Sequence, residues 1–94
     1  MKSDPTNLRY LRSLETKEEK LRFMTGGYVT VGKIGQVKEN SLVYCYCPRI
    51  RGIFIGDGNG VYMFDNPEEA KSVGERVMEE WKVELSLLEA EDHG

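Results

Sequence analysis

The alternation of residue types in three short segments is the strongest constraint on how this chain folds. Within residues 42–47, 53–55 and 61–64, every second side chain of an extended strand points to the same side. One side collects aliphatic and sulfur-containing residues, and the other collects aromatic ones. The aliphatic side holds Val43, Cys45, Cys47, Ile53, Ile55, Val61 and Met63, and the aromatic side holds Tyr44, Tyr46, Phe54, Tyr62 and Phe64. This pattern predicts a small sheet with two chemically different faces, one of which is available to a partner.

The length and the cysteine spacing bound the class of protein. A chain of 94 residues makes one domain, because it buries only roughly 60–65% of its unfolded surface. Cys45 and Cys47 lie one residue apart, and on a strand their side chains run parallel, which disfavours a mutual disulfide. The sequence shows neither an apolar run near the roughly 18 residues of a membrane span nor a signal-peptide core. We therefore expect a soluble, cytoplasmic protein with reduced thiols and no membrane partner.

Residues 1–27 are predicted to form a helical region. Asp4 and Pro5 suit the N-cap and the first helical position, and leucines recur along one face. Thr16 and Glu19 have the spacing of a capping box, so the region is either one helix or two. The glycine pair at 26–27 is expected to end it in a left-handed cap.

Residues 28–65 are predicted to form a four-stranded, mostly antiparallel sheet. The expected strands are 28–37, 42–47, 50–55 and 61–65. Pro48 is expected to end the second strand, because proline has no N–H to donate to a ladder. The Gly56–Gly60 segment contains Asp-Gly and Asn-Gly pairs, which favour a hairpin turn.

Residues 66–91 are predicted to form a long helix that packs on one face of the sheet, followed by a tail at 92–94. Asn66 suits the N-cap and Pro67 the first helical position. The apolar stripe of this helix consists of Ala70, Val73, Val77, Trp81, Leu85 and Leu88. At about 1.5 Å per residue the helix is longer than the strands, so its last turns overhang the sheet. Either the N-terminal helices or a second copy of the chain covers them, which makes Trp81, Leu85 and Leu88 candidate dimer contacts.

Two glycine-containing segments have the spacing of ligand-binding loops, but each lacks a side chain that the ligand requires. Residues 27–33 match the glycine and lysine spacing of a phosphate-binding loop, but Ile34 stands where a magnesium-binding hydroxyl is needed. Asp57 and Asn59 resemble the start of a calcium loop, but Val61 replaces the third oxygen ligand. Neither segment supports a cofactor.

The nucleophiles and soft ligands of the chain also lack the partners that catalysis or metal binding requires. A closed zinc site needs four ligands. Besides the two cysteines, the sequence contains one histidine, His93, which lies near its end. The same histidine is too poorly placed to activate a cysteine or serine. We expect no metal, no cofactor and no enzymatic activity.

The charge of the chain is divided between its two halves. Residues 1–56 carry ten Lys and Arg against five Asp and Glu, whereas residues 57–94 carry three against eleven. The halves either neutralise each other in the fold or leave the front half with a positive patch.

The aromatic face and nearby arginines form the predicted binding surface. Tyrosine, phenylalanine and arginine are enriched at protein interfaces. The predicted partner-binding residues are Tyr44, Tyr46, Arg49, Arg51, Phe54, Tyr62 and Phe64. The alternative is a stacking platform for single-stranded nucleic acid with Lys33, Lys38, Arg49 and Arg51 as phosphate contacts. The acidic C-terminal helix makes this alternative the weaker one. In a third interpretation, the aromatic face is simply the core and the aliphatic face is the open one, or register slips at Gly32 and Gly52 mix the two faces.

These observations predict a function by binding. The motifs identify no family. In type, the chain resembles small accessory regulators and inhibitors that act by occluding a larger partner, including virus-encoded inhibitors of bacterial defence, although no residue maps onto such a family. We expect a single α+β domain that works as a non-enzymatic protein-binding module, regulating or inhibiting a larger protein by occluding or recruiting it.

Overall fold

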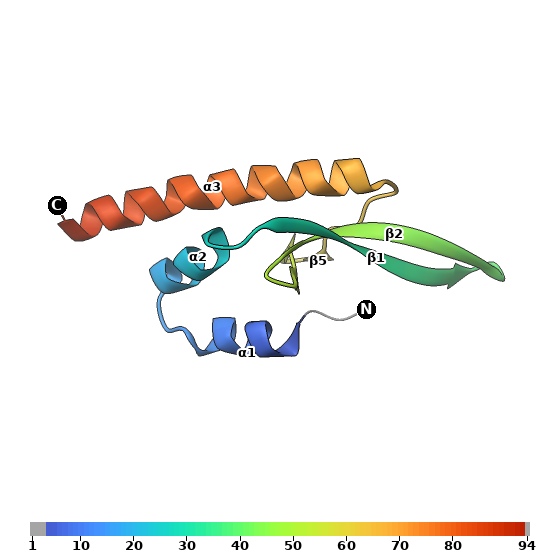
Figure 1. Cartoon of the computed structure of the whole chain (residues 1–94), viewed down its shortest axis with the longest axis horizontal. Coiled ribbons are helices and arrows are strands. Elements are labelled where there is room, and N and C mark those ends of the chain that lie inside the picture. Colours follow the sequence, from blue (N-terminus) through green and yellow to red (C-terminus); the bar gives the residue numbers. More distant parts are fainter. Residues whose placement is uncertain (1–3, 94) are drawn as a thin grey trace.

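The computed structural model describes residues 4–93 and has the α+β architecture that the sequence predicts. Its long C-terminal helix packs on a sheet, and the two N-terminal helices lie at one end (Figure 1). The molecule is elongated, with extents of 58 × 25 × 22 Å. The elements are α1 (Pro5–Ser13), α2 (Lys17–Thr25), β1 (Val29–Lys38), β2 (Ser41–Ile50), β3 (Ile53–Phe54), β4 (Gly56–Asp57), β5 (Gly60–Val61) and α3 (Pro67–His93).

The strands are antiparallel, but they do not form the single four-stranded sheet that was expected. Three strands pair in the order β1-β2-β3, and β4 pairs with β5 as a separate two-stranded ladder. Two tight turns set the register of the larger sheet. Glu39 and Asn40 have φ of 49° and 65°, and Arg51 and Gly52 have φ of 54° and 75°. Positive φ at both positions is the signature of a two-residue hairpin turn whose twist matches the strands.

The prediction that Pro48 ends the second strand is wrong, because β2 runs through it to Ile50. The carbonyl of Pro48 accepts a hydrogen bond from the N–H of Ile55 at 3.1 Å. The carbonyl of Ile55 in turn accepts from the N–H of Tyr62, also at 3.1 Å. An N–H at position 48 would point towards residue 55 and donate to its carbonyl. Proline has no N–H, and the N–H of Tyr62 donates to the carbonyl of Ile55 in its place. The expected third strand at 50–55 is shortened to β3 by the turn at Arg51.

The N-terminal region contains two helices. The hydroxyl of Thr16 accepts from the N–H of Glu19 at 3.1 Å, so the capping-box spacing marks a real helix start. The left-handed cap expected after α2 is wrong, because Gly26 has φ of −79° and ψ of −7°. A Cβ on Gly26 would lie 2.9 Å from the Arg51 guanidinium, and one on Gly27 would lie 2.7 Å from Arg51 Cγ. These glycines make room for Arg51.

The long helix begins as predicted. Asn66 Oδ1 accepts from the N–H of Glu69 at 2.7 Å, and Pro67 opens the helix. The helix continues to His93, through two residues expected to form a tail; Gly94 lies outside the described residues. Its most buried row consists of Ala70, Gly74 and Met78, of which Ala70 was in the predicted stripe and Gly74 and Met78 were not. A Cβ on Gly74 would lie 2.6 Å from Val29 Cγ1 and 2.9 Å from Pro48 Cβ. The missing side chain lets α3 approach the sheet closely.

The core lies between α3, α2 and the end of the sheet next to the Arg51 turn. It is built from Met24, Ile50, Ile53, Ile55 and Met78. Beyond the sheet, α2 packs against the second half of α3. There, Trp81, Leu85 and Leu88 are half-buried. Part of the cover for the overhanging helix is thus supplied within one chain by α2, and the three side chains stay candidate dimer contacts through their exposed parts.

Ion pairs join α2 to the acidic helix. Lys17 Nζ pairs with Glu84 Oε1, and an Arg22 guanidinium nitrogen lies 3.6 Å from Glu89 Oε1. The basic and acidic halves of the chain therefore neutralise each other in part within the fold. None of the helices in the described residues is long and apolar enough to cross a membrane.

Candidate functional site

The register of the sheet divides the predicted aromatic face between its two sides. Directly opposed residues of an antiparallel pair share a face. Tyr44 and Tyr46 pair with residues 35 and 33 of β1, whereas Phe54 pairs with Arg49. Since Arg49 is an odd number of positions from both tyrosines on β2, Phe54 lies on the face opposite to theirs. The prediction of one continuous aromatic face is wrong, because the two-residue turn at Arg51 sets a register that alternation within each strand does not reveal.

Three of the predicted aromatic residues lie at the edge of the core, next to the start of α3. Tyr46 forms an antiparallel bridge with Phe64, with backbone hydrogen bonds of 2.7 and 2.8 Å. The rings of Tyr62 and Phe64 have centroids 6.5 Å apart, and Tyr62 packs against the core. All three side chains are half-buried. They contribute mainly to packing.

The Arg49–Phe54 pair forms a small cluster on the other face of the sheet. The Arg49 guanidinium lies 5.7 Å from the Phe54 ring centroid. A Cβ on Gly32 would lie 2.8 Å from Phe54 Cε1 and 3.2 Å from Arg49 Cδ. The glycine therefore lets both side chains lie flat across β1.

Arg51 is a structural connection between the turn and the N-terminal helices. Its Nε donates to the carbonyl of Phe23 at 2.7 Å, and its guanidinium lies 4.6 Å from the Phe23 ring centroid. Its own carbonyl accepts from Asn7 Nδ2 at 2.7 Å. These contacts use the Nε and the backbone carbonyl of Arg51, so the residue ties the turn to both N-terminal helices.

A group of exposed apolar side chains lies at the far end of the β1–β2 hairpin. Val37 is 78% exposed, Leu42 58% and Tyr44 45%. Val37 and Leu42 are directly opposed, and Tyr44 lies on the same face. A Cβ on Gly35 would lie 3.3 Å from Leu42 Cδ1 and 3.4 Å from Tyr44 Cε1, so both side chains lean over this glycine. We call Val37, Leu42 and Tyr44 the hairpin patch.

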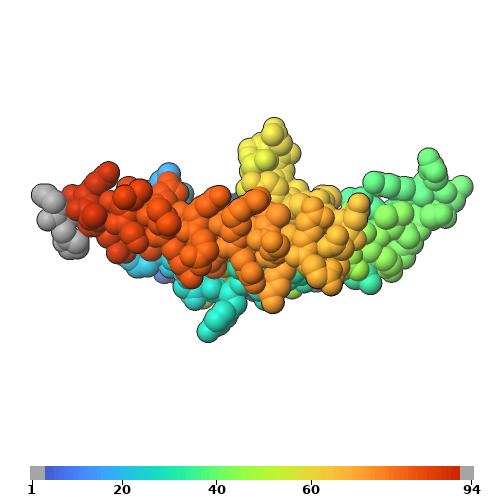
Figure 2. All heavy atoms as spheres, turned by 90° about the horizontal axis from the view of Figure 1, so that it is seen from above, coloured from blue at the N-terminus to red at the C-terminus, as the bar shows by residue number. Residues whose placement is uncertain are grey.

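The hairpin patch is exposed because the strands extend past the helix. β1 and β2 have ten residues each, which is about 33 Å of strand. Because α3 starts three residues after Phe64, which pairs with Tyr46 near the middle of β2, the outer half of the hairpin lies beyond it (Figures 1 and 2). Sequence reasoning placed Tyr44 in a binding surface but missed Val37 and Leu42. The signal that could have found them is the length of the two strands.

Positive charge accompanies the hairpin patch. Lys33 Nζ lies 4.0 Å from the Tyr44 ring centroid, and Lys38 precedes the turn at the end of the hairpin. The acidic helix α3 is packed at the other end of the sheet. On the reverse face, Val43 is 39% exposed beside the Gln36–Met63 contact. The hairpin thus carries apolar and cationic groups at a distance from most of the carboxylates.

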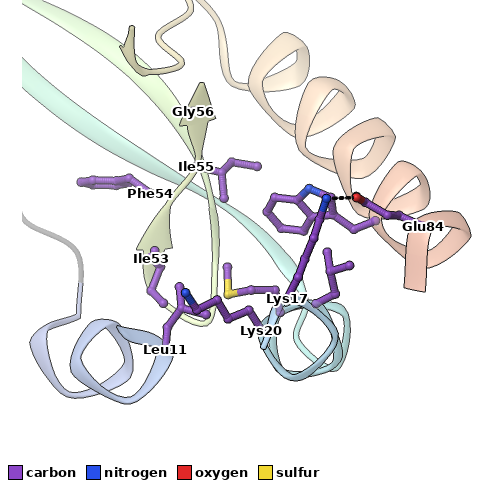
Figure 3. Close-up of a pocket in the computed structure, with 11 residues that line it drawn as sticks. Leu11, Lys17, Lys20, Ile53, Phe54, Ile55, Gly56 and Glu84 are labelled. Carbon is purple, nitrogen blue, oxygen red and sulfur yellow. Dashed lines mark ion pairs between the residues drawn. The ribbon is translucent and has the colours of Figure 1, made fainter. Parts of the chain in front are cut away.

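A second candidate is an apolar groove between the helices and β3, shown in Figure 3. Its volume is about 480 Å³. Its apolar walls come from Leu11, Leu21, Met24, Ile53, Ile55 and Trp81. The Lys17–Glu84 ion pair spans one side, and Phe54 points to the opposite side of its strand from Ile55. Leu21, Met24, Ile53 and Ile55 are also buried core residues, so the groove is an opening at the edge of the core.

The two cysteines behave as packing residues. Cys47 is fully buried, and desolvation raises the pKa of its thiol to about 11 although the nearby Arg49 charge opposes the shift. Cys45 Sγ lies 4.0 Å from Gln36 Oε1, and both thiols are free. Within the part of the chain that the structure describes, no three His, Cys, Asp or Glu residues come together as metal ligands.

These surfaces must be interpreted from their own chemistry. Comparison of the chain with protein-family models, with curated proteins and with solved structures finds no significant match.

Proposed function

We propose that this protein is a non-enzymatic protein-binding module that regulates or inhibits a larger protein partner by occluding or recruiting it. The observation that carries the proposal is the hairpin patch, whose apolar side chains extend beyond the helix that covers the rest of the sheet. Each large apolar side chain that a partner buries contributes roughly 1.5–3 kcal/mol of transfer free energy. A contiguous exposed apolar surface of this kind is characteristic of interaction sites.

The shape of the molecule supports contact through the hairpin end. The covered end of the sheet is held by core packing and by the Arg51 connections, so it provides a fixed base. The hairpin projects from this base as a ribbon with a regular register of ten paired residues. An arm of this kind can reach into a groove of a partner and occlude it. Two free thiols are consistent with a partner in the cytoplasm.

The protein hypothesis is better supported than nucleic-acid binding. A stacking platform needs several open aromatic faces beside cations. Here Lys33, Arg49 and Arg51 each lie against an aromatic ring of the same chain. Tyr46, Tyr62, Phe64 and Phe54 are half-buried, which leaves Tyr44 as the exposed aromatic residue of the predicted set. One ring is a poor platform for successive bases.

The proposal can be tested by capture with a variant that removes only the apolar character of the patch. The variant carries Val37→Thr, Leu42→Thr and Tyr44→Thr, because threonine is β-branched and favours strands. Tagged wild-type protein and the variant are incubated with lysate of the cells that express the protein, with and without nuclease. We expect one stoichiometric, nuclease-resistant protein on the wild type and its loss from the variant.

A matched control removes exposed apolar groups elsewhere. Val83 is 61% and Leu87 62% exposed on α3, similar to the patch. The control carries Val83→Gln and Leu87→Gln, which retain helix formers, and it is expected to capture the partner as the wild type does. Capture that depends on nucleic acid would overturn the protein hypothesis. Capture that the control variant loses and the patch variant retains would place the site on α3 instead.

A further inference from the structure

β1 forms an open edge of the sheet. In the described residues, the order β1-β2-β3 leaves the outer side of β1 without a neighbouring strand. Seen from above, the start of β1 emerges along one long side of α3, and the β4–β5 ladder emerges along the other (Figure 2). The edge is ten residues long, whereas exposed edges are usually short or interrupted because they can pair with other chains.

The hydrogen bonds of Tyr46 determine which groups of β1 point outward. Tyr46 exchanges both of its backbone hydrogen bonds with Phe64, on the side away from β1. Lys33, its partner on β1, therefore belongs to a non-hydrogen-bonded pair, and the N–H and C=O of Lys33 point away from β2. By alternation the same holds for Val29, Val31, Gly35 and Val37. These residues present a regular row of backbone donors and acceptors to a further strand.

We propose that the open edge of β1 accepts an extended segment of the protein partner as an added strand. This inference rests on the proposed function and specifies how the partner is recognised. A regular row of alternating backbone donors and acceptors is complementary to the backbone of another extended segment. The side chains of the outward residues face the same side of the sheet as the hairpin patch, so an added strand would extend this apolar surface.

Lys33 decides the chemistry of the added strand. It lies centrally on the edge, with Val31 on one side and Gly35 and Val37 on the other. An acidic residue opposite Lys33, with apolar residues two positions to either side, gives a favourable cross-strand charge pair and apolar contacts. The start of β1 lies beside Glu75 and Glu79 of α3, and Lys71 and Lys82 of the same helix balance these carboxylates. Lys33 is therefore the charge that sets the preference, and it favours one central acidic residue in the added strand.

The same lysine argues against a second copy of the chain as the occupant. The outward residues run from Val29, which pairs with Ile50, to Val37, so full overlap in a symmetric antiparallel pair of two β1 edges places Lys33 opposite Lys33 of the second copy. Like charges directly opposed across strands are destabilising. The edge therefore favours a different protein over self-association.

The test uses the full-length chain and a display library of random twelve-residue peptides. We expect the selected peptides to alternate apolar residues around one Asp or Glu. Gly35→Pro removes one outward N–H and no hydrogen bond to β2, and Gly35→Ala is its matched control because it adds a Cβ and retains the N–H. We expect binding to weaken about tenfold or more for Gly35→Pro and to change little for Gly35→Ala. Lys33→Glu should shift the preference to peptides with a central Lys or Arg.

Amide hydrogen exchange supplies a readout that does not depend on the variants. In the free chain, the outward amides of Val31, Lys33 and Gly35 should exchange faster than the inward amides of Gly32 and Ile34. Bound peptide should protect the outward amides. A library that yields no binder, or peptides whose binding leaves these amides unprotected, would overturn strand addition. Peptides that require the hairpin patch but tolerate Gly35→Pro would overturn it too, and would leave the proposed protein-binding function standing.

Discussion

The two ends of the β1–β2 ribbon have the same antiparallel backbone and very different surroundings. At the end near the Arg51 turn, α3 packs so closely that Gly74 has no room for a side chain, and Ile50 is fully buried. At the other end, Val37 and Leu42 lie in solvent on the same face of the same two strands. The difference shows that strand length and helix position, rather than residue type, decide which apolar side chains become core.

This comparison separates stability from recognition. The covered end contains the buried cluster and the contacts of Arg51, so it should set the free energy of unfolding. The uncovered end has the exposed apolar side chains of the hairpin patch, so it should set binding. Substitutions at matched positions of the two ends can test this separation.

The largest expected difference is between two aliphatic residues of β2. Ile50 and Leu42 lie on the same face of the strand, but Ile50 is 0% and Leu42 58% exposed. Ile50→Ala should lower the free energy of unfolding by about 2–5 kcal/mol, because it leaves a cavity. Leu42→Ala should cost less than about 1 kcal/mol. Urea denaturation of both variants measures this, and equal costs would contradict the separation.

A second prediction concerns the close approach of α3. Gly74→Ala should lower the free energy of unfolding by about 1–3 kcal/mol through overpacking, although alanine is the better helix former. The reason is that its Cβ would lie 2.6 Å from Val29 and 2.9 Å from Pro48. Gly58→Ala is the control, since a Cβ there has nothing within 4 Å. Thermal denaturation distinguishes them, and a more stable Gly74→Ala would show that α3 is not held by this contact.

A third prediction follows from the buried thiol. The pKa of Cys47 is raised by burial from 9.0 to about 11. The unfolded chain therefore releases this proton at lower pH than the folded chain does, so the contribution of Cys47 to stability is complete below pH 9 and declines as the pH rises towards 11. Denaturation of the wild type and of Cys47→Ala at pH 7, 9 and 10.5 checks this. The difference between them should shrink above pH 9, and a constant difference would contradict burial of the thiol.

The smallest expected effect is that of the ion pairs between α2 and α3. The Lys17–Glu84 side chains are 68% and 39% exposed. Glu84→Gln should therefore cost less than about 1 kcal/mol at low salt and close to nothing at about 1 M salt. Denaturation at the two ionic strengths measures it. A large cost that persists in salt would mean that this pair, rather than apolar packing by Trp81 and Leu88, holds α2 on the long helix.

Much of the fold could be predicted from local signals. Asn66 and Pro67 predict the start of α3, and Thr16 with Glu19 predicts the start of α2, because capping depends on residues close in sequence. The hairpin turns at 39–40 and 58–59 follow from Asn and Gly content in the same way. The α+β class follows from the order of these elements.

The binding surface could be predicted only in part, because it depends on register. Arg51 has a positive φ, which arginine seldom adopts, so the sequence does not indicate this turn. The turn places Phe54 opposite Arg49. Pro48 continues a strand because Tyr62, fourteen positions later, replaces its missing donor. A hydrogen-bond donor that comes from a residue distant in sequence leaves no local pattern. Tyr44 was assigned to an exposed surface, whereas the contribution of Val37 and Leu42 required the position of α3.

The most direct test of the separation between stability and recognition is the unfolding free energy of the patch variant with Val37→Thr, Leu42→Thr and Tyr44→Thr. If the hairpin patch contacts a partner and not the core, the variant should remain folded. Its free energy of unfolding should fall by no more than about 1.5 kcal/mol, which is the contribution of one cross-strand pair and the Lys33–Tyr44 contact. A loss of about 3 kcal/mol or more, in the range of a core truncation, would show that these side chains belong to the core of the free protein and would contradict their assignment to binding.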